Sequence, residues 1–471
     1  MAHLHKKIKK GRTYYYARES TSVGGKTKIT NQVYLGSIER IMEMARQSGE
    51  GGVVKLQVQE FGALWLACHV AEEVGLVDII DGLLHNEKRA PSPTTGEYFL
   101  FAVLNRMVEP RSKRALPEWY NSTAVQQLRY VDTQLLDSRH YWKCWHQVDE
   151  EHVKQIATQF FKAINAVAPS GRDCLLFDTT NFFTFFDEQN PSELAKRGKS
   201  KEGRDWLKQI GLALLVARDT RLPLFYREFE GNRHDSKVFL RVIEDVLDAA
   251  GKDEATLVFD KGMNSQENID AIDCVDHVHF ITTYSPYFAD DLMHVDLDRF
   301  TPVDSVKNRR LAEDGRDDDR LVARRTTREL WGAERTAIVT YNPFTATKQR
   351  YRFERKLLEL QTALFELRAA ARSWRKPDIK RAQKKYHEIC EALYLPKNLY
   401  DVSFEVREGR LRVGFRKNHY RISRHIDRFG KNIIVTDRHD WSTDEIVRAS
   451  LDRYIVEQAF RQSKDHELVR V

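Results

Sequence analysis

Residues 172–285 contain five short apolar stretches, which read CLLFD (174–178), IGLALLVA (210–217), LPLFYREF (222–229), TLVFD (256–260) and HVHFITT (277–283). Runs of this length, rich in aliphatic and aromatic residues, predict buried β-strands. Helical patterns precede the last two strands, in SKVFLRVIEDVLDAA (236–250) and SQENIDAI (265–272). Three strands in succession, followed by helix, strand, helix and strand, predict a mixed α/β sheet and not a doubly wound, all-parallel one.

Two aspartates end two of these apolar stretches. Asp178 closes CLLFD, and Asp260 closes TLVFD. A carboxylate at a strand end is held rigidly and points into the crevice beyond the sheet. If the two strands are neighbours, the two carboxylates can share a divalent cation, and their hard oxygens favour Mg²⁺ or Mn²⁺ over zinc. The alternative is that each aspartate is an ordinary turn residue.

The last helix supplies a third carboxylate. Ser442 as N-cap, with Glu445 three residues later, predicts a capping box that opens one helix running to about residue 464. Arg453, Glu457 and Lys464 are then spaced by four and seven residues, which places them on one helix face. Glu457 could complete a metal site while the two cations hold phosphates. The alternative is a row of surface ion pairs.

Three basic segments are candidate DNA contacts. In EGNRHDSKVF (230–239), Arg233 precedes a predicted helix start, where phosphates bind readily. In RSKRALPEWY (111–120), Arg111, Lys113 and Arg114 lie beside aromatic residues, which suits contact with a DNA backbone or, alternatively, a solvated helix end. The first 12 residues hold five Lys and Arg, and this arm is either a solvated flexible tail or a phosphate contact.

The remaining sequence predicts four further parts. Residues 1–50 contain a β-hairpin, centred on 12–36, and residues 51–168 are helical. Residues 353–394 carry a heptad pattern interrupted at Pro377, which predicts an antiparallel helical hairpin. Its apolar seam packs within the chain or against a partner. Strand-like TAIVTY (336–341) and YDVSFEVREGRLRVGFR (400–416) flank it, and FGKNIIVTD (429–437) is a turn and a strand.

Composition excludes several classes of protein. The 471 residues are 41% hydrophobic, with a net charge of +7, so the chain has cores to build and tolerates a polyanionic partner. Its five cysteines are scattered without a C-x-x-C pair, which argues against a disulfide scaffold or a structural zinc site and favours a reducing cytosol. No apolar run approaches a membrane span, and the N-terminus lacks the apolar core of a secretory signal.

Four of these segments, in this order, resemble the DDE transposases of bacterial insertion sequences, in the insertion-sequence-4 group. They are DTTNF (178–182), RLPLFYREFEGNRHDSKVF (221–239), LVFDKGMNSQENIDAI (257–272) and GKNIIVTDRHDWSTDEIVRASLDRYIVEQAFRQSK (430–464). NRMVEPRSKRALPEWY (105–120) also resembles the stretch that precedes the catalytic core in those proteins. Arg453, Glu457 and Lys464 stand at the matching positions of the family's third motif. Ser450 stands where that motif has a tyrosine.

The resemblance implies an RNase H-like catalytic core formed by residues 169–286 and 429–471, with an insertion at 287–428 and a DNA-binding helical region at 51–168. It implies a catalytic, metal-binding triad of Asp178, Asp260 and Glu457, holding two Mg²⁺ or Mn²⁺ ions with Asp178 between them. Arg453 and Lys464 would contact DNA, together with the basic residues of the segments at 111–120 and 230–239. Trp331, in the insertion, either stacks on an unpaired base or lies in the core.

The implied activity is cleavage of double-stranded DNA at inverted-repeat ends, followed by strand transfer into target DNA, by a homodimer in the bacterial cytoplasm, at the nucleoid, with no membrane. Family members usually continue after the third motif, whereas only DHELVRV (465–471) follows it here, and the interpretations of this difference are a fragment, a truncated reading frame and a decayed element. Two alternatives remain: an inactive or truncated transposase-derived DNA-binding protein, and an RNase H-like nuclease without strand transfer.

Overall fold

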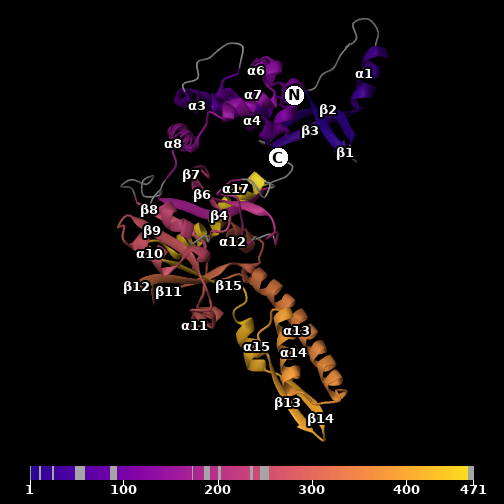
Figure 1. Cartoon of the computed structure of the whole chain (residues 1–471), viewed down its shortest axis with the longest axis vertical. Helices are drawn as coiled ribbons and strands as arrows, with labels where there is room; N and C mark the ends of the chain where they lie inside the picture. The colour runs from indigo at the N-terminus through magenta and orange to yellow at the C-terminus, as the bar shows by residue number, and fades with distance from the viewer. Residues whose placement is uncertain are drawn as a thin grey trace. The chain divides into compact units, whose positions relative to one another are not determined.

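The structure is a computed structural model that describes residues 2–9, 12–23, 26–47, 59–84, 93–171, 173–184, 191–199, 203–233, 237–243 and 254–464. The chain forms two compact units, one of residues 1–153 and the other of residues 154–469. Figure 1 labels the elements of both. No helix in the described ranges has the length and apolar character needed to cross a bilayer.

The first unit begins with a three-stranded antiparallel sheet in the order β1-β2-β3, followed by helix α1 (Ile38–Gln47). The predicted hairpin is confirmed as β2 (Arg12–Val23) and β3 (Lys26–Gly36), whereas β1 (Ala2–Lys9) is a strand that the sequence analysis treated as a tail. The reason is visible in AHLHKKIK, where the alternate positions 2, 4, 6 and 8 are Ala2, Leu4, Lys6 and Ile8, so that a lysine interrupts the apolar series. Lysines fill the gaps and hide the alternation.

The rest of the first unit is helical, as predicted. Its elements are α2 (Gly62–Glu73), α3 (Leu76–Leu84), α4 (Thr95–Val108), η1 (Lys113–Ala115), α5 (Leu116–Ser122), α6 (Val125–Leu128), η2 (Thr133–Leu135) and α7 (Ser138–Trp145). A capping box between Thr94 and Glu97 opens α4. Trp119, Tyr120 and Phe101 are almost fully buried between these helices. Helix α8 (Glu150–Val167) contains the boundary between the two units.

The second unit is built on a mixed sheet that begins with three antiparallel strands, β4 (Cys174–Thr184), β6 (Lys208–Ala217) and β7 (Pro223–Glu230), with the short β5 (Lys196–Arg197) also on β6. β8 (Ala255–Phe259) then pairs parallel to β4, and β9 (Val278–Tyr284) pairs parallel to β8, after helix α10 (Gln266–Asp273). The resulting order, β7-β6-β4-β8-β9, is the strand order of the RNase H-like core that the resemblance implied. Within the helix predicted at 236–250, the structure describes residues 237–243, which are helical.

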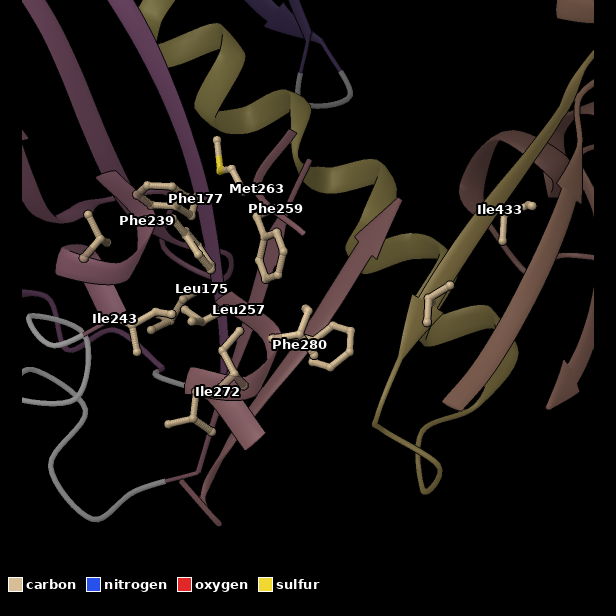
Figure 2. Close-up of a cluster of buried hydrophobic side chains, with 14 of the residues drawn as sticks. Leu175, Phe177, Phe239, Ile243, Leu257, Phe259, Met263, Ile272, Phe280 and Ile433 are labelled. Atoms are coloured by element: carbon tan, nitrogen blue, oxygen red, sulfur yellow. The ribbon is translucent and has the colours of Figure 1, made fainter. Parts of the chain in front are cut away.

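Alternate side chains of the core strands enter two hydrophobic layers. Leu175 and Phe177 of β4 join Phe239, Phe259 and Phe280 on one face of the sheet, as Figure 2 shows. On the other face, Cys174 and Leu176 pack with helices α16 (Thr443–Asp452) and α17 (Tyr454–Lys464). A strand buried on both faces explains why CLLFD reads as a continuous apolar run.

The segment between β9 and the last helices extends the same sheet. It contains α11 (Asp290–Met293), η4 (Leu297–Arg299), β10 (Thr301–Pro302), α12 (Val306–Glu313), η5 (Asp317–Asp319), β11 (Val322–Leu330) and β12 (Ala333–Tyr341). β15 (Lys431–Thr436) pairs antiparallel with both β9 and β12, so the sheet continues as β9-β15-β12-β11-β10. Trp331, at the turn between β11 and β12, packs edge-on against Phe280 and Tyr284 of the core.

The predicted helical hairpin is α13 (Pro343–Arg372) and α14 (Ile379–Ala392), with Pro377 in the connection. The heptad positions of α13, including Leu357, Leu360 and Leu364, are buried against α14 and the strands that follow, so the seam packs within the chain. β13 (Tyr400–Arg407) and β14 (Arg410–Lys417) form a two-stranded sheet beside the far end of the helical pair, and α15 (His419–Ile426) returns toward the core (Figure 1).

Candidate active site

Asp178 lies inside β4, as the fifth of its 11 residues. The prediction that Asp178 closes the strand is wrong, because the following TTNFFT continues the ladder with β6 as far as the pair Thr184–Lys208. Side chains alternate along a strand, so Asp178 shares its face with Cys174 and Leu176. That is the face covered by α16 and α17. The carboxylate therefore points toward the helix that carries Glu457.

Asp260 directly follows β8, as predicted. The parallel ladder between β4 and β8 ends at the pair Leu176–Val258. Two residues further in the same register, Asp178 stands opposite Asp260. Neighbouring strands lie about 4.8 Å apart, so this register brings the first two acids of the triad to adjacent positions.

A threonine of the next strand holds Asp260. The Thr283 hydroxyl donates to Asp260 Oδ1 at 2.9 Å, and the backbone N–H of Lys261 donates to the same hydroxyl oxygen at 3.2 Å. Thr283 belongs to β9, which is the parallel neighbour of β8. Sequence analysis missed this residue, although the polar TT that ends HVHFITT marked the place.

The helix of Glu457 is not continuous. Ser442 is the N-cap of α16, as predicted, and accepts a hydrogen bond from the Glu445 backbone at 3.2 Å. The prediction of one helix to residue 464 is wrong, because α16 ends at Asp452 and α17 begins at Tyr454. Arg453 occupies the break. The Arg453 carbonyl still accepts from the N–H of Val456 at 3.1 Å, so the chain turns tightly there and then resumes the helix.

Arg453 joins the three acids. Its Nη1 lies 2.7 Å from Asp260 Oδ1, and its Nη2 lies 3.4 Å from Glu457 Oε1. The contact with Asp260 is an ion pair without hydrogen-bond geometry. Burial alone would lower the pKa of Arg453, but contact with Asp260 and the negative charges of Asp260, Asp178 and Glu457 raise it. One guanidinium is therefore within electrostatic reach of all three predicted catalytic carboxylates.

The same contact acts on Asp260. Partial burial raises the pKa of this carboxyl, but the side chain and charge of Arg453, followed by the Thr283 hydrogen bond, lower it further than burial raises it. The net effect is a pKa below the ordinary value, so Asp260 is ionised at neutral pH. An ionised carboxylate is the form that binds cations.

Lys464 lies at the end of α17, over the same face of β4. Its Nζ is 5.5 Å from the centroid of the Phe182 ring. Phe182 is four residues after Asp178 and shares its face of the strand by alternation. Lys464 is thus placed along β4 from the carboxylates, on the side where α17 packs.

The other predicted DNA contacts are not brought to this cluster by any contact in the described residues. Arg233, in the turn after β7, pairs with Glu230 at 2.7 Å, while residues 234–236 of the same motif, His234 among them, lie outside the described residues. Arg111, Lys113 and Arg114 belong to the first unit. Arg111 pairs with Glu109, Lys113 lies over the Tyr141 ring at 5.9 Å, and Arg114 is exposed.

The carboxylates suit a hard divalent cation in chemistry and charge. Asp178, Asp260 and Glu457 offer oxygen ligands only, which Mg²⁺ and Mn²⁺ prefer. Within the described ranges, however, no three His, Cys, Asp or Glu side chains converge closely enough to hold a metal ion. The cationic group that these three acids share is Arg453. The donor set therefore fits a metal, provided that the guanidinium gives up its contact with Asp260.

Residues 169–469 match the family model described as the transposase DDE domain. The chain belongs to this transposase family. The match spans both segments of the core, from before β4 to beyond α17, and the whole insertion between them. No curated protein matches the chain.

Two solved transposase structures are similar to this DDE transposase chain. One is the piggyBac transposase synaptic complex with hairpin DNA, with 10% sequence identity, a TM-score of 0.30, and coverage of 59% of this chain and 57% of that chain. The other is the Mos1 transposase paired-end complex with the left transposon end, with 12% identity, a TM-score of 0.16, and coverage of 41% and 61%. The chain thus spans less than two thirds of the length of each.

Proposed function

We propose that this chain is a transposase of a bacterial insertion sequence, in the insertion-sequence-4 group, that cuts DNA at the inverted-repeat ends and joins those ends to target DNA. The observation that carries the proposal is that Arg453 lies 2.7 Å from Asp260 and 3.4 Å from Glu457, while Asp178 stands opposite Asp260 in the register of β4 and β8. These acids come from distant parts of the sequence, and the family match covers all three.

In this function, Asp178, Asp260 and Glu457 would hold two Mg²⁺ or Mn²⁺ ions. Bound metal supplies activation of a water or a DNA 3′-hydroxyl and stabilisation of the leaving oxygen in an in-line displacement. The protein's own residues do the positioning. Thr283 fixes the orientation of Asp260 through its 2.9 Å hydrogen bond. Lys464 and Arg233 would contact phosphates.

Arg453 has two roles in this proposal. Before DNA arrives, its guanidinium neutralises Asp260 and Glu457. When a phosphodiester enters, the guanidinium moves from carboxylate to phosphate, because both are anions that match its planar fork of N–H donors. The exchange frees Asp260 as the DNA is bound. Cleavage competence is thereby linked to the presence of substrate.

The first test is a cleavage assay on labelled duplexes that carry the DNA flanking this gene, with Mg²⁺ or Mn²⁺. The variant is Glu457→Gln, and its matched control is Gln458→Ala, an exposed neighbour on the same helix. We expect metal-dependent cutting at the repeat boundary by the wild type and the control, and none by Glu457→Gln. Cutting by Glu457→Gln at the wild-type rate contradicts the triad.

Two further measurements separate the rival functions. Transfer of the cut end into a second labelled duplex distinguishes a transposase from a nuclease that only hydrolyses DNA. A chain that binds the ends but does not cut them with either metal is the DNA-binding protein of the alternative reading. In the cell, the complex would form in the cytoplasm, at the nucleoid. Size-exclusion chromatography of the purified chain with end DNA should give a complex of two protomers and two ends. A single protomer on a single end contradicts the homodimer.

A further inference from the structure

The N-terminal sheet carries basic residues on one face. In the register between β1 and β2, Lys7 stands opposite Tyr14 and Lys9 opposite Arg12. Side chains alternate along each strand, so residues that are paired across the strands, or two apart within one, share a face. Arg18 is therefore on the same side as these residues. We call Lys7, Lys9, Arg12 and Arg18, with the tyrosines between them, the basic face.

This face has no counter-charge of its own. Glu19 is the only acidic residue among the first 36, and it pairs with Ala2 and Asn31, on the opposite side of the sheet from Arg18. Within the described part of the chain, Lys7, Lys9, Arg12 and Arg18 make no ion pair. Four cations on one small surface repel each other, and an external anion relieves that repulsion.

The pKa of His5 is also affected by the positive charges of the basic face. His5 lies on the basic face opposite Tyr16, between His3 and Lys7 along β1. Slight burial, followed by the charges of Arg18, His3 and Lys7, lowers the pKa of His5. The cations are therefore close enough together to oppose a further positive charge.

Aromatic side chains lie among these cations. The Tyr34 ring on β3 is 6.1 Å from that of Tyr14 and 5.1 Å from that of Tyr16, in tilted contacts. Because the rings lean on each other, they are poorly placed to stack flat on separate bases. Next to them, Arg18 Nε donates to Gln32 Oε1 at 2.7 Å, which leaves further N–H groups of both side chains for other acceptors.

The dimensions of the sheet suit a DNA duplex. The major groove of B-form DNA, about 12 Å wide, admits a two-stranded β-ribbon, and the antiparallel strands β1 and β2, about 4.8 Å apart, form such a ribbon with β3 beside it. Lysines on the edge strand β1 would meet a phosphate backbone, while side chains of β2 and β3 would meet base edges. The polar Arg18–Gln32 pair has the donor groups that such base edges accept.

We propose that the basic face is a duplex-DNA-binding site, which enters the major groove, contacts phosphates through Lys7 and Lys9, and presents Arg12 and Arg18 to base edges. This site lies in the first unit, apart in sequence from the triad and from the helical region predicted to bind DNA. The inference rests on the proposed function only for the identity of the DNA, which is the transposon end. The binding itself stands on the charge and shape of the sheet.

The test measures the affinity of the full chain, without divalent metal, for a fluorescent duplex from the flanking end DNA over a range of salt concentrations. The double variant K7A/K9A removes two basic-face cations. The control Lys6→Ala removes the lysine that immediately precedes Lys7, on the opposite side of the same strand. Counterion release predicts that K7A/K9A lowers the salt slope by about 1.8 and weakens binding about thirtyfold at 0.15 M salt. Lys6→Ala should change neither.

Two results overturn the proposal: an unchanged salt slope in K7A/K9A, or an equal loss in Lys6→Ala. Tighter binding of single-stranded DNA of the same sequence, or of phosphatidylserine vesicles, also overturns it. The wild type should bind a duplex of scrambled sequence more weakly than the end duplex. If this difference disappears in Gln32→Ala, the result supports recognition of bases by Gln32. Failure of cleavage with intact duplex binding counts against the proposed function alone, and intact cleavage with an unchanged salt slope in K7A/K9A counts against this inference alone.

Discussion

The two sheets of this protein differ in whether their charged side chains have a partner of opposite charge within the chain. In the core sheet, the acids of the candidate active site share a cation from the same chain, because Arg453 lies between Asp260 and Glu457. On the N-terminal sheet, the basic face has no acid at all. A charge that is neutralised internally must first be released, and that release can be tied to a binding event. A charge with no internal partner is ready for an external one. The core sheet is therefore suited to chemistry that depends on DNA binding, and the N-terminal sheet is suited to DNA recognition.

Asp178→Asn gives the largest expected effect. The amide keeps the shape of the side chain but removes a charged oxygen ligand, so DNA cleavage should fall by at least about a thousandfold. Binding of end DNA should stay within about twofold of the wild type, because the basic face is untouched. Quantitative cleavage and anisotropy measurements on the same preparation check both. Loss of binding and cleavage together would show that the two sheets do not divide the work in this way.

Arg453→Gln tests the internal neutralisation. Removing the cation leaves partly buried carboxylates facing each other, and the free energy of unfolding should fall by about 1–2 kcal/mol, a modest value because Asp260 and Glu457 are about half exposed. Mn²⁺ should then raise the Tm of the variant more than that of the wild type, since it replaces the missing charge. Thermal unfolding with and without Mn²⁺ measures this.

The control for that experiment is Arg461→Gln, at an exposed arginine of α17, the helix that directly follows Arg453. It should leave both the Tm and its response to Mn²⁺ unchanged. Equal Mn²⁺ responses in Arg453→Gln and wild type would mean that the guanidinium does not compete with cations for these carboxylates.

Low pH tests the contact between Arg453 and Asp260 in a second way. The pKa of Asp260 is lowered in the folded chain, so the Arg453 contact stabilises the fold above the ordinary carboxyl pKa, and this stabilisation is lost as the pH falls through the lower folded value. The difference in unfolding free energy between wild type and Arg453→Gln should therefore shrink below about pH 4. Urea unfolding at pH 7 and pH 3 compares them. A constant difference across this range would assign the effect of Arg453 to packing.

His5 gives the smallest expected effect, on the other sheet. Its pKa lies below 6.5 in the free protein, by slight burial and by Arg18, His3 and Lys7. A phosphate bound at the basic face would raise that pKa, so the complex would take up a proton and duplex affinity would rise as the pH falls below 6.5. A gain of about threefold between pH 7.5 and 5.5 is expected. In His5→Gln the gain should disappear, and NMR titration of His5 with and without duplex should show the shift directly.

Sequence alone predicted most of the catalytic sheet. The apolar runs around Asp178 and Asp260 marked buried strands, and the heptads of α13 marked the helical hairpin, because each pattern arises from burial. Four motifs in order indicate the transposase family from the sequence alone. The strand β1 was missed because lysines interrupt its apolar positions, and alternation is recognised chiefly from apolar residues.

The parts of the site that escaped prediction depend on tertiary contacts. The break between α16 and α17 has no Gly or Pro to announce it, since the sequence there reads LDRYIV. The ion pair between Arg453 and Asp260 joins residues 193 positions apart, and only the packing of α17 on β4 brings them together. The continuation of β4 beyond Asp178 likewise depends on its ladder with β6.

The place where the segment from α13 to α15 joins the sheet has a consequence for the evolution of this protein. β12 and β15 are adjacent antiparallel strands, and their ladder ends at the pair Tyr341–Lys431. Just beyond it, the N–H of Asn342 donates to the carbonyl of Gly430 at 2.9 Å, which closes the ladder as a tight turn would. Everything from α13 to α15 leaves and returns through that single closure. Evolution can therefore lengthen, shorten or exchange this lobe as a cassette without altering the strand order, and an engineered two-residue turn in its place should leave a foldable sheet.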